Sequence, residues 1–138
     1  MKNLMSSIAL GSCLLVPSWG LAQDEIIGKM IYDDHCSVCH GEGGAGDGLV
    51  AELFDQKPKN LTNLAKLNNG VFPFESVYQG IDGRREVRAH GFSHMPIWGD
   101  FFLEQALTDR GHHPRDARTM AEGRILAVVY YLQTLQKE

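Results

Sequence analysis

The stretch that decides the fold is Cys36-Ser37-Val38-Cys39-His40, followed by Gly41-Glu42-Gly43-Gly44-Ala45-Gly46-Asp47-Gly48. The two cysteines are three positions apart, and a histidine comes directly after the second one. Five glycines in eight residues leave no regular element behind the histidine, so a tight loop is expected there. The chain of 138 residues has only three cysteines, which are too few for a disulfide framework or a four-cysteine zinc site.

The spacing in residues 36–40 is that of the C-x-x-C-H motif, at which haem is attached covalently. Two thiols with a short, fixed separation can add to the two vinyl groups along one edge of a porphyrin. The next residue, His40, then falls under the iron, where a neutral imidazole nitrogen is a good axial ligand. The sequence therefore predicts one covalently bound haem c, with thioethers from Cys36 and Cys39 and an iron ligand from His40.

Three other chemistries can use a C-x-x-C pair. A thioredoxin-like redox pair begins a helix in an α/β unit, whereas here glycines follow and no strand signal precedes. A zinc site could add His90 and His94, but 50 residues separate the two pairs, far more than in a zinc finger. A disulfide between Cys36 and Cys39 would close a very small, strained ring. A non-haem thiol or zinc protein is therefore the minor alternative.

The first 22 residues have the three parts of a secretory signal peptide. Lys2 supplies a positive start, residues 4–16 are mostly apolar, and Gly20-Leu21-Ala22 places small residues at positions −3 and −1 of a cleavage site. The apolar stretch is shorter than the roughly 18 residues that span a bilayer, which disfavours an uncleaved anchor. A lipoprotein site at Cys13 is a lesser alternative. We expect cleavage after Ala22, a periplasmic location and a single domain over residues 23–138.

Removal of the signal peptide changes the meaning of the composition. Lys2 and Cys13 are lost, so 12 basic residues face 17 acidic ones, and two cysteines remain. An acidic chain is a poor nucleic-acid binder, and no second hydrophobic span follows. The sequence therefore predicts neither a nucleic-acid partner nor an integral membrane span. The two cysteines that remain in the mature chain are the number that one haem needs.

The apolar pattern predicts an all-α domain of short helices and long loops. One helix is expected to begin with Asp24 as its cap, and its apolar positions step by three and four residues along one face: Ile26, Ile27, Met30 and Ile31. Residues 125–135 have the clearest helical periodicity, and no strand signal of weight occurs. A domain with so small a core needs a large apolar cofactor against which its loops can pack.

Short helices are also predicted over 61–69 and 73–81, with a turn at Asp82-Gly83. Residues 84–93 are expected to be polar and irregular, and the charged segment 109–119 is expected to be a surface excursion. The one basic cluster of the chain consists of Arg84, Arg85, Arg88 and His90. This cluster would contact haem propionates or an acidic partner protein, or it would be a solvated loop. The adjacent pair His112-His113 is expected to be solvated.

A haem that only carries electrons needs a second axial ligand, and a thioether ligand raises its reduction potential. The candidates are Met30, Met95, Met120, His35, His90, His94, His112 and His113. Met30 and Met120 fall on or beside the apolar faces of the terminal helices, where methionine is usually core filler. Met95 instead lies in a loop that Pro96 stiffens, with Trp98 and Phe101-Phe102 available as apolar walls. We therefore predict Met95 as the distal iron ligand, with His94 and His90 as the alternatives.

With these features the chain resembles the class I c-type cytochromes of the single-haem, bacterial periplasmic type. The haem motif with Gly41 matches the family, and Gly28 and Tyr32 match the small and aromatic positions of its first helix. The segment Met95-Pro96-Ile97-Trp98-Gly99 resembles the family's distal-methionine loop. Residues 126–135, with Tyr130-Tyr131, resemble its closing helix. The resemblance covers nearly all of residues 24–136, but residues 101–119 are longer than the usual link to the last helix.

The resemblance implies a cytochrome c-like fold, in which three to five short helices wrap around one haem and the first and last helices cross. It also implies an electron carrier, not an enzyme, that exchanges single electrons with redox protein partners such as a dehydrogenase or a terminal oxidase or reductase. The alternative is a haem c subunit of, or a dedicated electron acceptor for, a periplasmic dehydrogenase or other oxidoreductase.

Overall fold

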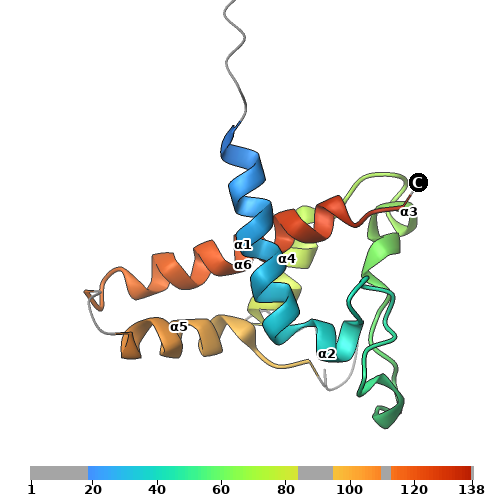
Figure 1. Ribbon diagram of the computed structural model, residues 1–138, viewed down its shortest axis with the longest axis horizontal. Coiled ribbons are helices and arrows are strands. Elements are labelled where there is room, and N and C mark those ends of the chain that lie inside the picture. The colour runs from blue at the N-terminus through green and yellow to red at the C-terminus, as the bar shows by residue number, and fades with distance from the viewer. Residues whose placement is uncertain (1–18, 84–94, 110–112, 138) are drawn as a thin grey trace, which may run out of the picture.

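The computed structural model describes residues 19–83, 95–109 and 113–137, and these ranges are helical without any strand (Figure 1). The elements, in chain order, are α1 (Trp19–His35), α2 (Ser37–His40), the 3-10 turns η1 (Ala51–Leu53) and η2 (Leu61–Asn63), α3 (Leu64–Leu67), α4 (Phe74–Asp82), α5 (Trp98–Thr108) and α6 (Ala117–Thr134). The predicted all-α, cytochrome c-like fold class is confirmed. The described α-helices outnumber the expected three to five because α2 and α3 are single turns of four residues each.

The two longest helices, α1 and α6, cross each other (Figure 1). Gly28 is buried at the crossing, where a Cβ atom would lie 2.0 Å from the carbonyl oxygen of Ala127. One turn further on, the buried ring of Tyr32 lies 5.3 Å from the ring of Tyr131. The helices are therefore as close as their backbones permit, and glycine is the residue that allows this approach.

The face of α1 that packs on α6 is not the one that the apolar pattern predicted. Ile26, Ile27 and Met30 expose 62%, 46% and 61% of their surface, so the expectation that Met30 fills the core is wrong. The helix also begins at Trp19, which places Asp24 inside α1 rather than at its cap. The prediction failed because Gly28, which marks the packing face, has no side chain to count as apolar.

Helices α4 and α5 complete the core by packing on α6. Helix α4 starts after Pro73 and is followed by Gly83, whose φ of 72° makes a left-handed C-cap. This agrees with the predicted helix over 73–81 and with the turn predicted after it. The helix predicted over 61–69 is instead divided between η2 and α3. Helix α6 begins at the fully buried Ala117, so the surface excursion expected over 109–119 ends before this residue.

Several predicted features lie outside the described residues. They are most of the signal peptide (residues 1–18), the segment 84–93 with Arg84, Arg85, Arg88 and His90, and the histidines His94 and His112. His113 is described, and it is exposed, with its Nδ1 accepting a hydrogen bond from the backbone N–H of Arg115 at 3.2 Å. None of the described helices has the length and apolar character that a membrane crossing requires.

Candidate functional site

Cys36, Cys39 and His40 lie together at the point where α1 passes into α2. Cys36 is the N-cap of α2, and its carbonyl oxygen accepts hydrogen bonds from the N–H groups of Cys39 at 3.2 Å and His40 at 2.9 Å. Its own N–H donates to the carbonyl oxygen of Tyr32 at 2.8 Å, which joins this turn to α1. Both cysteines are free thiols and half-buried. One short turn therefore holds two thiols and an imidazole at a fixed separation.

The imidazole of His40 is oriented by the loop that follows it. Its Nδ1 lies 2.9 Å from the carbonyl oxygen of Lys59, and because a carbonyl oxygen only accepts, Nδ1 is the donor. The loop is tied to the same turn by a hydrogen bond from the N–H of Gly48 to the carbonyl oxygen of Cys39 at 3.1 Å. A neutral imidazole that donates through Nδ1 keeps the Nε2 lone pair for a metal, which is the usual arrangement of metal-ligating histidines.

Burial favours the uncharged forms of the Cys36 thiol and the His40 imidazole. Loss of solvent raises the pKa of the Cys36 thiol to about 12, with a smaller contribution from Cys39 in the same direction. Loss of solvent also lowers the pKa of His40, against a smaller opposing effect of its bond to the carbonyl oxygen of Lys59. The turn thus presents a neutral imidazole, the protonation state in which histidine binds iron.

Met95, the predicted distal ligand, lies three residues before α5 and is half-buried against the core. The start of α5 meets the end of α1 through aromatic rings, since the ring of His35 lies 5.4 Å from that of Trp98. His35 directly precedes Cys36, and Trp98 follows Met95 by three residues. The fold therefore brings the segment that contains Met95 to the same end of α1 as the cysteine-histidine turn.

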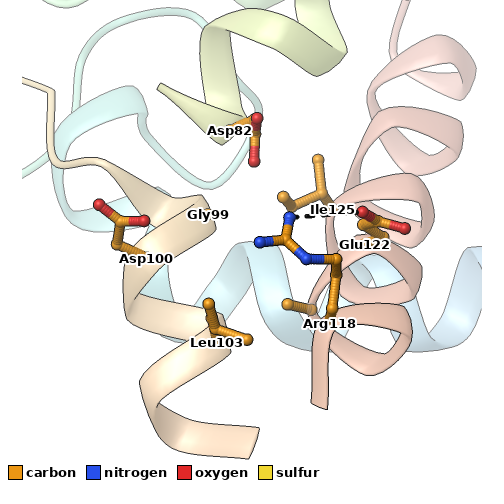
Figure 2. Close-up of a pocket in the computed structure, with 8 residues that line it drawn as sticks. Asp82, Gly99, Asp100, Leu103, Arg118, Glu122 and Ile125 are labelled. Atoms are coloured by element: carbon orange, nitrogen blue, oxygen red, sulfur yellow. Dashed lines mark ion pairs between the residues drawn. The ribbon is translucent and has the colours of Figure 1, made fainter. Parts of the chain in front are cut away.

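The position at which α5 begins is set by its junction with α4 and α6 (Figure 2). Asp82, which is only 7% exposed, points into this junction from the end of α4 (Figure 2). A Cβ atom on Gly99 would lie 2.2 Å from Oδ1 of Asp82 and 2.6 Å from its carbonyl oxygen. On the α6 side, Arg118 and Glu122 pair at 4.0 Å. The close fit of Gly99 on Asp82 fixes the start of α5 and, with it, the segment that carries Met95.

The cavity at this junction is too small for a cofactor. Its volume is about 20 Å³, which is room for about one water molecule. Among the residues that the structure describes, no group of three or more histidine, cysteine, aspartate or glutamate side chains is arranged to hold a metal ion. The turn at residues 36–40 is the candidate cofactor site because it brings together two free thiols and an oriented imidazole.

The residues of this turn fit a covalently bound haem. The two free thiols, the single imidazole with its available Nε2 and the thioether of Met95 are the donor types that c-type haem uses. Around the buried core, a set of apolar side chains remains only half-buried, as expected of a fold that packs on an apolar group: Leu61, Phe72, Phe74, Val77, Met95 and Trp98.

Two residues of the site were missed in the sequence. Lys59 is an exposed residue, but its main-chain carbonyl orients His40. Because every residue carries a carbonyl, no side-chain pattern could have revealed this role. His35 was considered only as an iron ligand, whereas its ring packs on α5. The available signal of this packing role was the position of His35 in the sequence, directly before the first cysteine and four residues after the apolar Ile31.

Comparison with known proteins identifies the domain. Searches of curated proteins and of solved structures gave no match. A family model described as "Cytochrome C oxidase, cbb3-type, subunit III" matches residues 23–109, more than half of the chain. The matched range contains the cysteine-histidine turn, Met95 and the whole of α5. The family is one of c-type cytochrome domains, which bind haem covalently and transfer electrons. The chain therefore belongs to the family of cbb3-type cytochrome c oxidase subunit III and is a c-type cytochrome domain.

Proposed function

We propose that the protein carries single electrons between redox proteins in the periplasm, as a single-haem class I c-type cytochrome. Its haem would be attached through Cys36 and Cys39, with His40 and Met95 as iron ligands. The observation that carries the proposal is the bond between Nδ1 of His40 and the carbonyl oxygen of Lys59, which leaves Nε2 available beside two free thiols. When bound, haem c supplies a one-electron couple between ferric and ferrous iron.

The residues of the chain then have distinct tasks. Cys36 and Cys39 would hold the porphyrin through thioethers, and the Lys59 carbonyl orients His40 for its role as an iron ligand. Met95 would favour the ferrous state and so raise the reduction potential. If His40 and Met95 both bind the iron, no coordination position is left for a substrate, which is why the proposed role is that of a carrier and not of an enzyme.

Two features of the sequence support the finer parts of the proposal. The chain has one C-x-x-C-H motif, and a single motif supplies thioethers for one haem. Residues 1–22 have the pattern of a cleavable signal peptide, which supports export to the periplasm, the compartment in which the mature domain, residues 23–138, would meet its partners.

A second candidate is a haem c subunit that works inside a permanent oxidoreductase complex. The description of the family, which names an oxidase subunit, favours it, and so do the large apolar side chains of Leu49 and Leu53, which expose 91% and 81% of their surface. The two candidate functions are distinguished by purifying the exported protein from both the membrane and the membrane-free fractions of its native cells. A carrier is recovered alone, whereas a subunit is recovered with an oxidase or dehydrogenase chain in fixed proportion.

The ligand assignment is tested by comparing Met95→Ala with Met30→Ala. We expect the ferric protein to show the methionine-to-iron charge-transfer band, and Met95→Ala to lose it. Met30, which is largely exposed on α1, is the matched control, and its replacement should leave the band intact. The ferrous form of Met95→Ala should also bind carbon monoxide readily, unlike the unaltered protein. A band that survives in Met95→Ala would overturn the assignment.

A further inference from the structure

The imidazole of His35 sits among three aromatic rings of α5. Its centroid lies 5.4 Å from that of Trp98, 5.3 Å from that of Phe101 and 5.6 Å from that of Phe102, with interplanar angles of 49°, 66° and 73°. All three distances fall in the range of roughly 4.5–7 Å in which tilted and edge-to-face ring pairs attract. We call these four residues the His35 cluster.

The three rings from α5 also contact one another. Trp98 lies 5.4 Å from Phe101 and 5.8 Å from Phe102, and the two phenylalanines are 5.5 Å apart. Phe102 is almost fully buried in the core. His35 is therefore packed against a group of mutually contacting rings that is anchored in the interior by Phe102, although Phe101 is 41% exposed.

The His35 cluster joins two segments that are otherwise held separately. Helices α1 and α5 each pack mainly on α6 rather than on each other. His35 is the last residue of α1 and directly precedes Cys36, whereas Trp98 is the first residue of α5 and follows Met95 by three positions. The ring contact between His35 and Trp98 therefore links the cysteine-histidine turn to the methionine loop, residues 95–97, because each ring belongs to a residue next to one of these segments.

We propose that His35 is a positioning residue, which acts through its aromatic ring to hold the methionine loop against the haem-attachment turn. The proposal rests on the proposed function, because it concerns the ligation of iron by Met95. The effect depends on ring packing, so another aromatic side chain at position 35 preserves it, and an aliphatic side chain of similar volume does not. Weaker positioning gives Met95 more freedom to leave the iron, which exposes the distal site to added ligands.

The test compares His35→Leu and His35→Phe in the full-length holoprotein, with His113→Ala as a control at an exposed histidine away from the cluster. The readouts are the methionine-to-iron charge-transfer band of the ferric form and the rate at which the ferrous form binds carbon monoxide. We expect His35→Leu to weaken the band and to raise the rate at least tenfold. His35→Phe and His113→Ala should match the unaltered protein in both readouts.

The outcomes separate this inference from a general loss of stability. A lower melting temperature of His35→Leu with an unchanged band and an unchanged carbon monoxide rate overturns the inference. A His35→Phe variant that behaves like His35→Leu overturns it as well, since ring packing would not be the cause. If the unaltered protein itself lacks the band, the proposed function fails, and that result is visible before any variant is measured.

A second variant approaches the same contact from α5. Trp98→Leu should raise the carbon monoxide rate as His35→Leu does, and the double variant should show no further rise beyond about twofold, because the two residues belong to one cluster. Rates that multiply in the double variant would show that the two side chains act independently, which contradicts the proposed contact.

Discussion

Two side chains near the attachment turn, the buried Tyr32 and the half-buried His40, are held by main-chain carbonyl oxygens. The hydroxyl of Tyr32 donates to the carbonyl oxygen of Gly41 at 2.6 Å, and Nδ1 of His40 donates to that of Lys59 at 2.9 Å. The first bond fixes Gly41, the residue directly after His40, to the last turn of α1, and the second fixes the imidazole ring itself. Between them they determine where the predicted proximal ligand lies relative to the two long helices.

The bond of Tyr32 is tested by Tyr32→Phe. This change keeps the ring that packs on Tyr131 but removes the hydroxyl, so the buried carbonyl of Gly41 loses this donor. We expect the free energy of unfolding of the holoprotein, measured in urea, to fall by about 1–2 kcal/mol. Tyr130→Phe is the control, because Tyr130 is 43% exposed, and its effect should stay within about 0.5 kcal/mol. Equal losses of unfolding free energy in the two variants would show that the hydrogen bond to Gly41 contributes no more than an exposed tyrosine hydroxyl does.

At the scale of the site, what the sequence could predict was local. Residues 36–40 are contiguous, so the placement of two thiols and an imidazole on one turn follows from their spacing. The partner of His40 is 19 residues away and is a main-chain carbonyl, which leaves no trace in the residue types. The ring contact between His35 and Trp98 joins α1 to α5, and such pairings become visible only once the helices are packed.

Among the secondary-structure elements, prediction succeeded where the ends of a helix are marked and failed where its buried face is made of small residues. Pro73 and Gly83 delimit α4, which was predicted to within a residue at either end. The packing face of α1 is centred on Gly28, and the first two buried positions of α6 are Ala117 and Ala121. Such residues add little to an apolar count, although they are the ones that let helices approach closely.

The α1–α6 crossing is tested by Gly28→Ala. A methyl group at this position would collide with the carbonyl of Ala127, so the helices must move apart, and we expect a loss of about 1–3 kcal/mol in the free energy of unfolding in urea. Gly123 in α6 is the matched control, because nothing lies within 4 Å of a Cβ placed there. Gly123→Ala should stabilise the protein by about 0.5–1 kcal/mol. A neutral Gly28→Ala would contradict the close crossing.

The same crossing predicts a loss of stability in alkali. Burial raises the pKa of both Tyr32 and Tyr131 above the ordinary value of 10.0. Their contribution is complete below about pH 10, and above it the unfolded chain releases protons that the folded chain keeps, so stability falls as the pH rises. We expect the urea midpoint to fall more steeply from about pH 9 to about pH 11 in the unaltered protein than in Tyr131→Phe. Identical slopes would show that Tyr131 is not held protonated by the fold.

Over the whole molecule, the described core belongs to the long helices and α4, whereas the connection from α2 to α3 contributes little to it. Between residues 41 and 60, the buried positions are Gly41, Gly44 and Ala51, none of which has a large side chain. Leu49 and Leu53 are exposed instead. A chain segment with so little buried apolar surface opens easily on its own, and a haem held by the adjacent turn would supply the surface on which it packs.

Removal of the haem should therefore open this segment first. The variant Cys36→Ser/Cys39→Ser cannot form the thioethers, and we expect trypsin to cut it after Lys59 at least about tenfold faster than the holoprotein, because the carbonyl of Lys59 is bonded to His40 in the folded site. Val38→Ala is the control, since it changes an exposed residue between the two cysteines and should keep both haem and protection. Equal rates of cleavage after Lys59 with and without haem would show that the cofactor does not support this segment.

The proposed function requires that Cys36 and Cys39 attach one haem to this chain. The most direct test is the pyridine haemochrome spectrum of the exported, purified protein, taken after denaturation and again after extraction with acidified organic solvent. We expect the spectrum of a haem with both vinyl groups saturated, one haem per chain, and a haem that stays with the polypeptide through the extraction. A protein without haem, or one whose haem passes into the solvent, would contradict the proposed function.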